Sequence, residues 1–185
     1  MQIENHFEIP APPAPAWAML MNVPETAACF PGADMVEALS ADQYQGRITV
    51  KLGPLTMVFA GKLQIEDRDD VAHSATIKAN WTETKGRGNA LTVTRFALQE
   101  QGDGARVTLQ SELQLAGQVA QYGRGVGMIS AISAQLMSTF AENLGVRIQA
   151  VELGRATPPE PAHKAAPEIS GLTLIAKTLV NRLKG

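Results

Sequence analysis

The sequence predicts an α+β fold, with a curved antiparallel sheet wrapped around one long helix. Three observations predict it. Residues 33–116 alternate apolar and polar side chains in short runs, which is typical of strands with one covered face. Residues 122–153 carry apolar side chains at helical spacing instead. The order of one strand, two short helices, six strands and a long helix favours a helix-grip arrangement, in which the helix crosses the sheet.

The first predicted elements are a strand and two short helices. Residues 2–9 alternate strictly and predict the strand. A proline cluster follows, and residues 15–21 predict a short helix because Pro15 is tolerated in a first helical turn. Residues 24–29 predict a second short helix, which should end at the Pro-Gly turn at positions 31–32.

Six further strands are predicted, because apolar side chains recur at every second position between polar turns. The Gln-Gly-Asp-Gly sequence at 101–104 has a composition typical of a hairpin turn. The segment 83–89 contains two glycines and predicts a loop. The six strands are expected at residues 35–39, 43–52, 55–65, 73–81, 91–99 and 106–115.

The long helix is predicted over residues 122–153 and completes a first domain at 1–153. A helix of about 30 residues is about 45 Å long, which is enough to cross the open face of a curved sheet. Its apolar stripe consists of Tyr122, Val126, Ile129, Leu136, Phe140, Leu144, Ile148 and Val151.

A Pro-rich linker at 154–167 precedes a predicted amphipathic basic tail helix at 168–185. At about 100° per residue, aliphatic side chains fall on one face of this helix, with Lys177 and Lys184 opposite. A helix needed for the core would not usually be tethered through four prolines. We therefore expect it to dock on a membrane or a partner, although such a helix can also dock on its own domain or on a second copy. The residues expected to contact a membrane are Ile169, Leu172, Ile175, Lys177, Leu179, Arg182, Leu183 and Lys184.

The energy of this contact predicts a weak and reversible anchor. Each basic residue near an anionic surface contributes about 1 kcal/mol. Partial burial of about six aliphatic side chains adds several kcal/mol, since full burial of each contributes about 1.5–3 kcal/mol. Helix formation opposes binding, because an isolated helix of this length is marginal in water.

Composition and charge exclude several classes of protein. The chain has 185 residues, of which 45% are hydrophobic and 18% charged, so it can form a packed domain. Its net charge of −2 argues against a nucleic-acid binder. The start of the sequence lacks a secretory signal, and no apolar run approaches the roughly 20 residues that span a bilayer. We expect a cytoplasmic protein, peripheral on the inner face of the cell membrane.

Three segments resemble the SRPBCC or START-like superfamily and, within it, the G-subunit family of carbon monoxide dehydrogenase. They are VPETAACFPG at 23–32, YQGRITVKLGP at 44–54 and FAGKL at 59–63. The resemblance extends over roughly the first 150 residues. The family usually has an aliphatic residue at the position of Phe30.

The resemblance implies a cavity between sheet and long helix that takes a lipophilic ligand. It also implies association with a molybdenum hydroxylase of the carbon monoxide dehydrogenase type at the cytoplasmic membrane. Because such enzymes pass electrons to the respiratory chain, a respiratory quinone is the expected cargo. The first hypothesis is non-enzymatic ligand transfer between membrane and dehydrogenase. The alternatives are a membrane-recruitment or assembly adaptor without cargo and, less favoured, a small-molecule cyclase or hydrolase.

The apolar faces could form a packed core or line a pocket. Small residues at in-phase positions, such as Gly61 and Ser111, and seven methionines favour the pocket. The residues expected to line it are Phe30, Met57, Phe59, Ile77, Trp81, Val93, Leu109, Leu113, Met128, Ile132, Leu136 and Phe140.

Catalytic and metal-binding patterns are weak in this sequence. Its three histidines fall in different elements, without the spacing of metal ligands, so no metal or catalytic residue is predicted. Cys29 is better explained as a small buried residue than as a nucleophile. The glycines at 123–127 do not follow a βαβ unit, which argues against a dinucleotide loop.

Overall fold

A computed structural model describes residues 1–52, 55–124 and 126–152 of the chain. The strands are β1 (Gln2–Ile9), β2 (Ala33–Ala38), β3 (Gln43–Leu52), β4 (Leu55–Asp69), β5 (Ser74–Glu83), β6 (Gly88–Gln101) and β7 (Gly104–Gly117). The helices are α1 (Pro13–Met21), α2 (Val23–Cys29), the 3-10 helix η1 (Gln118–Arg124) and α3 (Val126–Glu152). The predicted linker at 154–167 and tail helix at 168–185, with the expected membrane-contacting residues, lie outside the described part.

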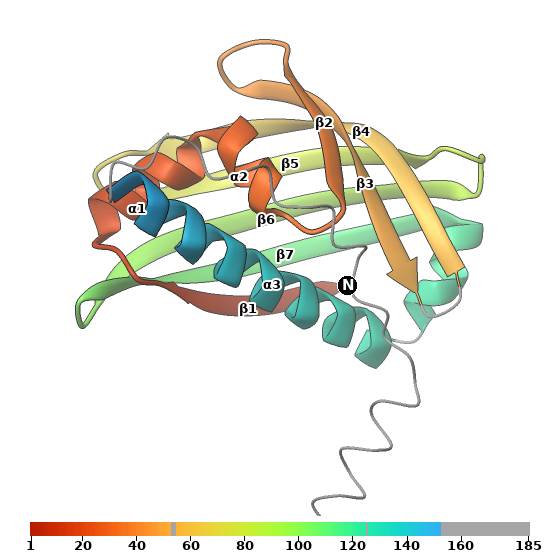
Figure 1. The fold of residues 1–185 in the computed structure, drawn as a ribbon. Helices are drawn as coiled ribbons and strands as arrows, with labels where there is room; N and C mark the ends of the chain where they lie inside the picture. Colours follow the sequence, from red (N-terminus) through yellow and green to blue (C-terminus); the bar gives the residue numbers. More distant parts are fainter. Residues whose placement is uncertain (53–54, 125, 153–185) are drawn as a thin grey trace, which may run out of the picture.

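The described strands form one antiparallel sheet in the order β1-β7-β6-β5-β4-β3-β2. From β2 to β7 the chain runs as a meander, and β1 then pairs with β7, so that Phe7 lies opposite Val107. The first strand therefore lies beside the last one, and β1 and β2 form the two edges of the sheet. The sheet curves strongly, and its concave face is the covered one (Figure 1).

The helix α3 crosses the concave face near the β1 edge, while α1 and α2 lie at one end of the sheet and η1 at the other (Figure 1). Two polar contacts hold α3 to α2. Arg147 forms an ion pair with Glu25, and the side-chain amide of Asn143 donates to the carbonyl oxygen of Cys29 at 2.9 Å. With Leu144 fully buried between these contacts, the second half of α3 is firmly docked.

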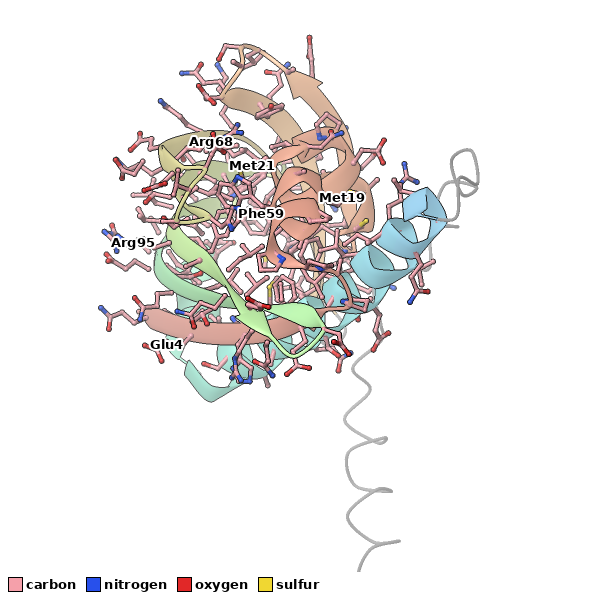
Figure 2. All side chains as sticks on the ribbon, turned by 90° about the vertical axis from the view of Figure 1, so that its left-hand side faces the viewer. Glu4, Met19, Met21, Phe59, Arg68 and Arg95 are labelled. Atoms are coloured by element: carbon pink, nitrogen blue, oxygen red, sulfur yellow. The ribbon has the colours of Figure 1, made fainter. Side chains whose placement is uncertain are left out.

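The core consists of two clusters along the concave face. The larger one packs beneath α1, α2 and the second half of α3, and includes Trp17, Phe96 and Phe140. The smaller one lies towards η1 and comprises Met57, Phe59, Ala90 and Val119. Buried Phe59 thus lies on the inside of the molecule, whereas exposed Arg95 is on its outside (Figure 2).

The predicted α+β helix-grip class and element order are confirmed, but several boundaries differ. The strands β4 and β6 run several residues beyond the predicted 55–65 and 91–99, because backbone pairing continues after the apolar alternation stops. Most of the expected loop 83–89 is consequently strand or turn between paired strands. The long helix begins at Val126 and not at 122, because the preceding glycine-containing stretch adopts a 3-10 turn.

Candidate ligand cavity

A cavity of about 350 Å³ lies between the concave face of the sheet, the short helices and α3. The larger part of its wall is apolar and comes from elements far apart in the sequence. Arg47 of β3 is also at its wall, although strand alternation places the Arg47 side chain on the face opposite to Gly46 and Ile48. The apolar lining residues with large side chains are Phe7, Leu20, Met21, Val23, Phe30, Ile48, Leu63, Ile65, Ile77, Trp81, Phe96, Val107, Leu109, Met137 and Phe140.

Three phenylalanines form one side of this wall. The rings of Phe7 and Phe140 meet edge to face with centroids 5.4 Å apart, and the ring of Phe30 lies 5.7 Å from that of Phe140. Such geometry is favourable for aromatic pairs and restricts the rings. Phe140 therefore connects β1, the end of α2 and α3 in one rigid piece of wall.

Two glycines lie opposite each other in neighbouring strands next to Trp81. Gly46 of β3 lies opposite Gly61 of β4, which in turn lies opposite Trp81 of β5. A Cβ atom at Gly61 would lie 2.6 Å from Cε3 of Trp81 and 2.2 Å from the carbonyl oxygen of Asn80. The indole therefore covers the position that a side chain would occupy, and the sheet bends closely around it.

Neutral polar groups interrupt the apolar wall in two pairs. The amide of Asn5 on β1 donates to the hydroxyl of Ser133 on α3 at 2.8 Å. The hydroxyls of Thr94 on β6 and Ser111 on β7 share a hydrogen bond of 2.9 Å. All four residues line the cavity and are half-buried. They can hold a ligand's carbonyl or hydroxyl oxygen without placing a charge in the apolar interior.

Apart from Arg47, no ionisable residue is among the described residues that line the cavity. Cys29 is buried nearby, and its burial raises the pKa of the thiol, so the reactive thiolate is disfavoured at neutral pH. The described residues also contain no group of three or more metal-ligating side chains. The described wall of the cavity is therefore mainly apolar and neutral.

The structure brings five of the predicted pocket residues to the cavity, namely Phe30, Ile77, Trp81, Leu109 and Phe140. Met57 and Phe59 instead belong to the smaller core cluster, and Leu113 packs against it. Ile132 and Leu136 are covered but do not line the cavity. The side chain of Met128 lies outside the described part of the structure.

The placement of Val93 in the pocket is wrong. Val93 pairs with Lys78 and Glu112, which are exposed on the convex face, whereas its neighbour Thr94 points into the cavity. In the sequence of β6, large apolar residues occupy odd positions at first, as at Leu91, and even positions from Phe96 onwards. Alternation alone therefore could not show which set faces inwards.

The predicted pocket residues did not include the lining residues of α1 and α2, and on α3 they included Phe140 but not Met137. Ser133, Met137 and Phe140 share one face of α3, with the i, i+4, i+7 spacing of a helix. The prediction also placed Ile132 and Leu136 in the pocket, but these two residues lie one position away from Ser133 and Met137 and do not line it. Ser133 is, like Ser111, one of the small in-phase residues that favoured a pocket, and it lines the cavity.

A curved antiparallel sheet that grips a long helix above an apolar cavity defines a START-like, or SRPBCC, domain. Solved structures share this fold. A conserved protein from Geobacillus kaustophilus aligns with a TM-score of 0.71 at 17% identity, covering 80% of this chain and 95% of its own. The Zhui aromatase/cyclase from Streptomyces sp. R1128 aligns with a TM-score of 0.56 at 13% identity, and the alignment covers 81% of this chain and 94% of the cyclase. A protein from Mycobacterium smegmatis aligns with a TM-score of 0.58 at 16% identity, and the alignment covers 81% of this chain and 92% of that protein.

The chain belongs to the CoxG family, the G subunits of carbon monoxide dehydrogenase, whose model matches residues 6–148. The resemblance seen in the sequence is thereby confirmed. None of the curated proteins matches the sequence. Within the described residues, no helix has the length and apolarity needed to cross a bilayer.

Proposed function

We propose that this protein is a non-enzymatic carrier of a lipophilic ligand, which it transfers between the cytoplasmic membrane and a molybdenum hydroxylase of the carbon monoxide dehydrogenase type. The cavity of about 350 Å³ carries this proposal, because it is enclosed mainly by apolar side chains and its hydrogen-bonding pairs are neutral. Membership of the CoxG family supports the choice of partner enzyme.

A respiratory quinone fits the chemistry of this wall. Its ring carries two carbonyl oxygens, which accept hydrogen bonds, and the hydroxyls of Thr94 and Ser111 are donors of the right kind. Phe30, Trp81 and Phe140 would contact the flat faces of the ring. A volume near the lower end of the usual range for ligand pockets suits the head group and the first part of an isoprenoid chain.

We assign ligand contact to the residues that were predicted from the sequence and that also line the cavity. They are Phe30, Ile77, Trp81, Leu109 and Phe140. No catalytic residue is assigned, because the described lining lacks a carboxylate, histidine or cysteine. These are side chains that commonly act as general acids and bases in enzymes.

Extraction of bound lipid tests the cargo. Protein purified without detergent from its native host should release a lipophilic molecule detectable by mass spectrometry. Leu109→Trp places a large ring in the cavity and should reduce the extracted amount at least about tenfold. Leu91→Trp is the matched control, because Leu91 is 41% exposed. An empty parent protein, or an L109W variant that is folded by circular dichroism and as loaded as the control, would refute the carrier.

Membrane attachment is assigned to residues 168–185, on the amphipathic pattern of their sequence. Deleting residues 169–185 should abolish flotation with anionic liposomes and leave the circular dichroism spectrum of the domain unchanged. Replacing anionic lipid with neutral lipid should weaken binding of the full chain, since Lys177, Arg182 and Lys184 would lose their electrostatic contribution. Undiminished flotation of the truncated chain would remove this part of the proposal.

A further inference from the structure

A second hollow lies between α3 and the edge strand β1, on the far side of the helix from the ligand cavity. It is an open groove of about 820 Å³, lined by residues 4–8 of β1 and by one face of α3. We call it the β1–α3 groove. Small residues at Ala134, Ser138, Ala141 and Gly145 recur along the helical side. Their spacing keeps them on one face, so the groove has a smooth wall that another helix could approach closely.

The groove lacks a partner within the described part of the structure. β1 pairs with β7 on one side only, and its other edge faces the groove. Val146 projects from α3 with 64% of its surface exposed, although it is a large aliphatic residue. An apolar helix face beside an unpaired strand edge is a surface on which a further segment can be buried.

The charge of the groove restricts the occupant. Glu4, His6, Glu8 and Glu142 line it, with Glu8 also accepting a hydrogen bond from Gln101 of β6, and no lysine or arginine is among its described lining residues. Glu4 lies on β1 at the outside of the molecule (Figure 2). An occupant with an apolar face and basic flanks is therefore favoured over an acidic one.

We propose that residues 168–185 of the same chain dock in the β1–α3 groove as an amphipathic helix. This segment has one acidic residue, Glu168, and three basic ones, Lys177, Arg182 and Lys184. Its aliphatic face would cover the small residues and Val146 of α3, and its basic residues would approach the glutamates of the groove.

The length of chain between α3 and the segment permits this docking. α3 ends at Glu152, and the 15 residues from 153 to 167 can span about 45 Å if extended at about 3.1 Å per residue. The groove along α3 extends back to Ala134, which is about 27 Å from Glu152 at 1.5 Å per residue. The segment can therefore turn back and lie along the whole groove.

Docking would connect the segment to the ligand cavity, because Asn5, Phe7 and Met137 line both hollows. A helix packed on the outside of this shared wall restrains the side chains that line its inside. The same aliphatic face cannot contact the groove and a membrane at once. With the membrane role proposed above, on which this consequence depends, the groove acts as a competitor that holds the segment until an anionic surface displaces it.

Hydrogen exchange of the full chain tests the docking directly. The groove variant carries Glu4→Gln, Glu8→Gln and Glu142→Gln, and glutamine at position 8 keeps the acceptor for Gln101. The matched control carries Asp42→Asn, Glu100→Gln and Asp103→Asn, which are exposed, lie outside the groove and change the net charge equally. Amides of residues 168–185 should exchange at least about threefold more slowly in the parent and the control than in the groove variant.

Vesicle binding supplies the second readout. The groove variant should bind anionic vesicles at least about threefold more tightly than the control, because a larger fraction of its segments is free. Exchange of residues 168–185 at the rate of an unfolded peptide in all three proteins would overturn the docking. Protection that appears only as protein concentration rises would also overturn it, since the occupant would then belong to a second copy. Failure of vesicle binding with protection retained would refute the membrane role and leave the docking intact.

Discussion

The side-chain amide of Asn5 donates a hydrogen bond of 2.8 Å to the hydroxyl of Ser133 and joins edge strand β1 to the first half of α3. The two residues are 128 positions apart, and both line the ligand cavity. The contact sets the rotation of α3 about its axis. Met137 and Phe140, one and two turns further on, both line the cavity.

Ser133→Ala should lower the free energy of unfolding by about 1 kcal/mol, because the half-buried amide of Asn5 loses its acceptor. Chemical denaturation measures this change. Ser138→Ala is the control, since Ser138 lies on the same helix and is exposed. Equal stability of the two variants would show that the hydrogen bond does not hold α3 in place.

Gly61→Ala should destabilise the fold by about 1–3 kcal/mol, the usual cost of inserting a methyl group into a packed interior. The added Cβ would lie 2.2 Å from the backbone oxygen of Asn80, which cannot move without disturbing β5. Gly127→Ala is the matched control, because no atom lies within 4 Å of its Cβ position. Thermal unfolding should separate the two, with Gly127→Ala unchanged or up to about 1 kcal/mol more stable. A tolerated Gly61→Ala would argue against the close approach of Trp81.

Stability should fall as the pH is lowered from about 4.5 to about 2, because of Glu83. This carboxylate is buried, and bonding to the Arg87 guanidinium lowers its pKa from 4.5 to about 2, helped by the backbone amides of Lys85 and Arg87. A lowered pKa in the folded state means that the unfolded state binds the proton more readily. The stabilisation by ionised Glu83 is therefore fully present above the pKa that this residue has in the unfolded chain. It is lost as the pH falls towards the pKa that Glu83 has in the folded protein.

Denaturation of parent and Glu83→Gln across this pH range measures the effect. The parent should be the more stable at neutral pH, and the difference should narrow as the pH falls. Glu100→Gln, at an exposed position, should follow the parent at every pH. A constant difference between parent and Glu83→Gln would mean that Glu83 does not titrate in this range.

Thr94→Val should weaken binding of a quinone about tenfold and leave the affinity for a hydrocarbon chain unchanged. Valine keeps the shape of threonine and removes the hydroxyl that bonds to Ser111 inside the cavity. A hydrogen bond contributes about 0.5–1.5 kcal/mol, and about 1.4 kcal/mol corresponds to tenfold in affinity. Quenching of Trp81 fluorescence by short-chain quinone and by an alkyl ligand would measure both constants. An equal loss of affinity for both ligands would mean that Thr94 contributes by packing and not through its hydroxyl.

Local sequence was sufficient to predict which side chains point inwards wherever the apolar residues of a strand kept one constant alternation. In β5, Ala75, Ile77, Ala79 and Trp81 all take the inward positions that their spacing predicts, and Ala79 is 5% exposed. The two short helices were also predicted from local sequence, although α1 begins at Pro13 and not at Pro15, and Gly32 terminates the following turn at a φ of +83°. Such signals depend on the backbone and on near neighbours, which the sequence contains.

The burial of Glu83 could not be predicted from the local sequence. The acidic residue and two glycines of segment 83–89 predicted a loop, yet Glu83 ends β5 with 1% exposure. Its burial is possible only because Arg87 and two backbone amides surround the carboxylate. Those partners meet it after the chain has turned, so its environment could not be inferred from residue type.

The sequence by itself determined the α+β class, the family and the set of apolar faces, because periodicity and short motifs act between neighbours. Only the tertiary structure decided which apolar residues surround a hollow. Val93 turned outwards and Ser133 inwards because strand register and the rotation of α3 are set by contacts such as Asn5 to Ser133 and Gly46 to Gly61. A cavity is the space that packed side chains leave empty, and that space depends on all of these distant contacts together.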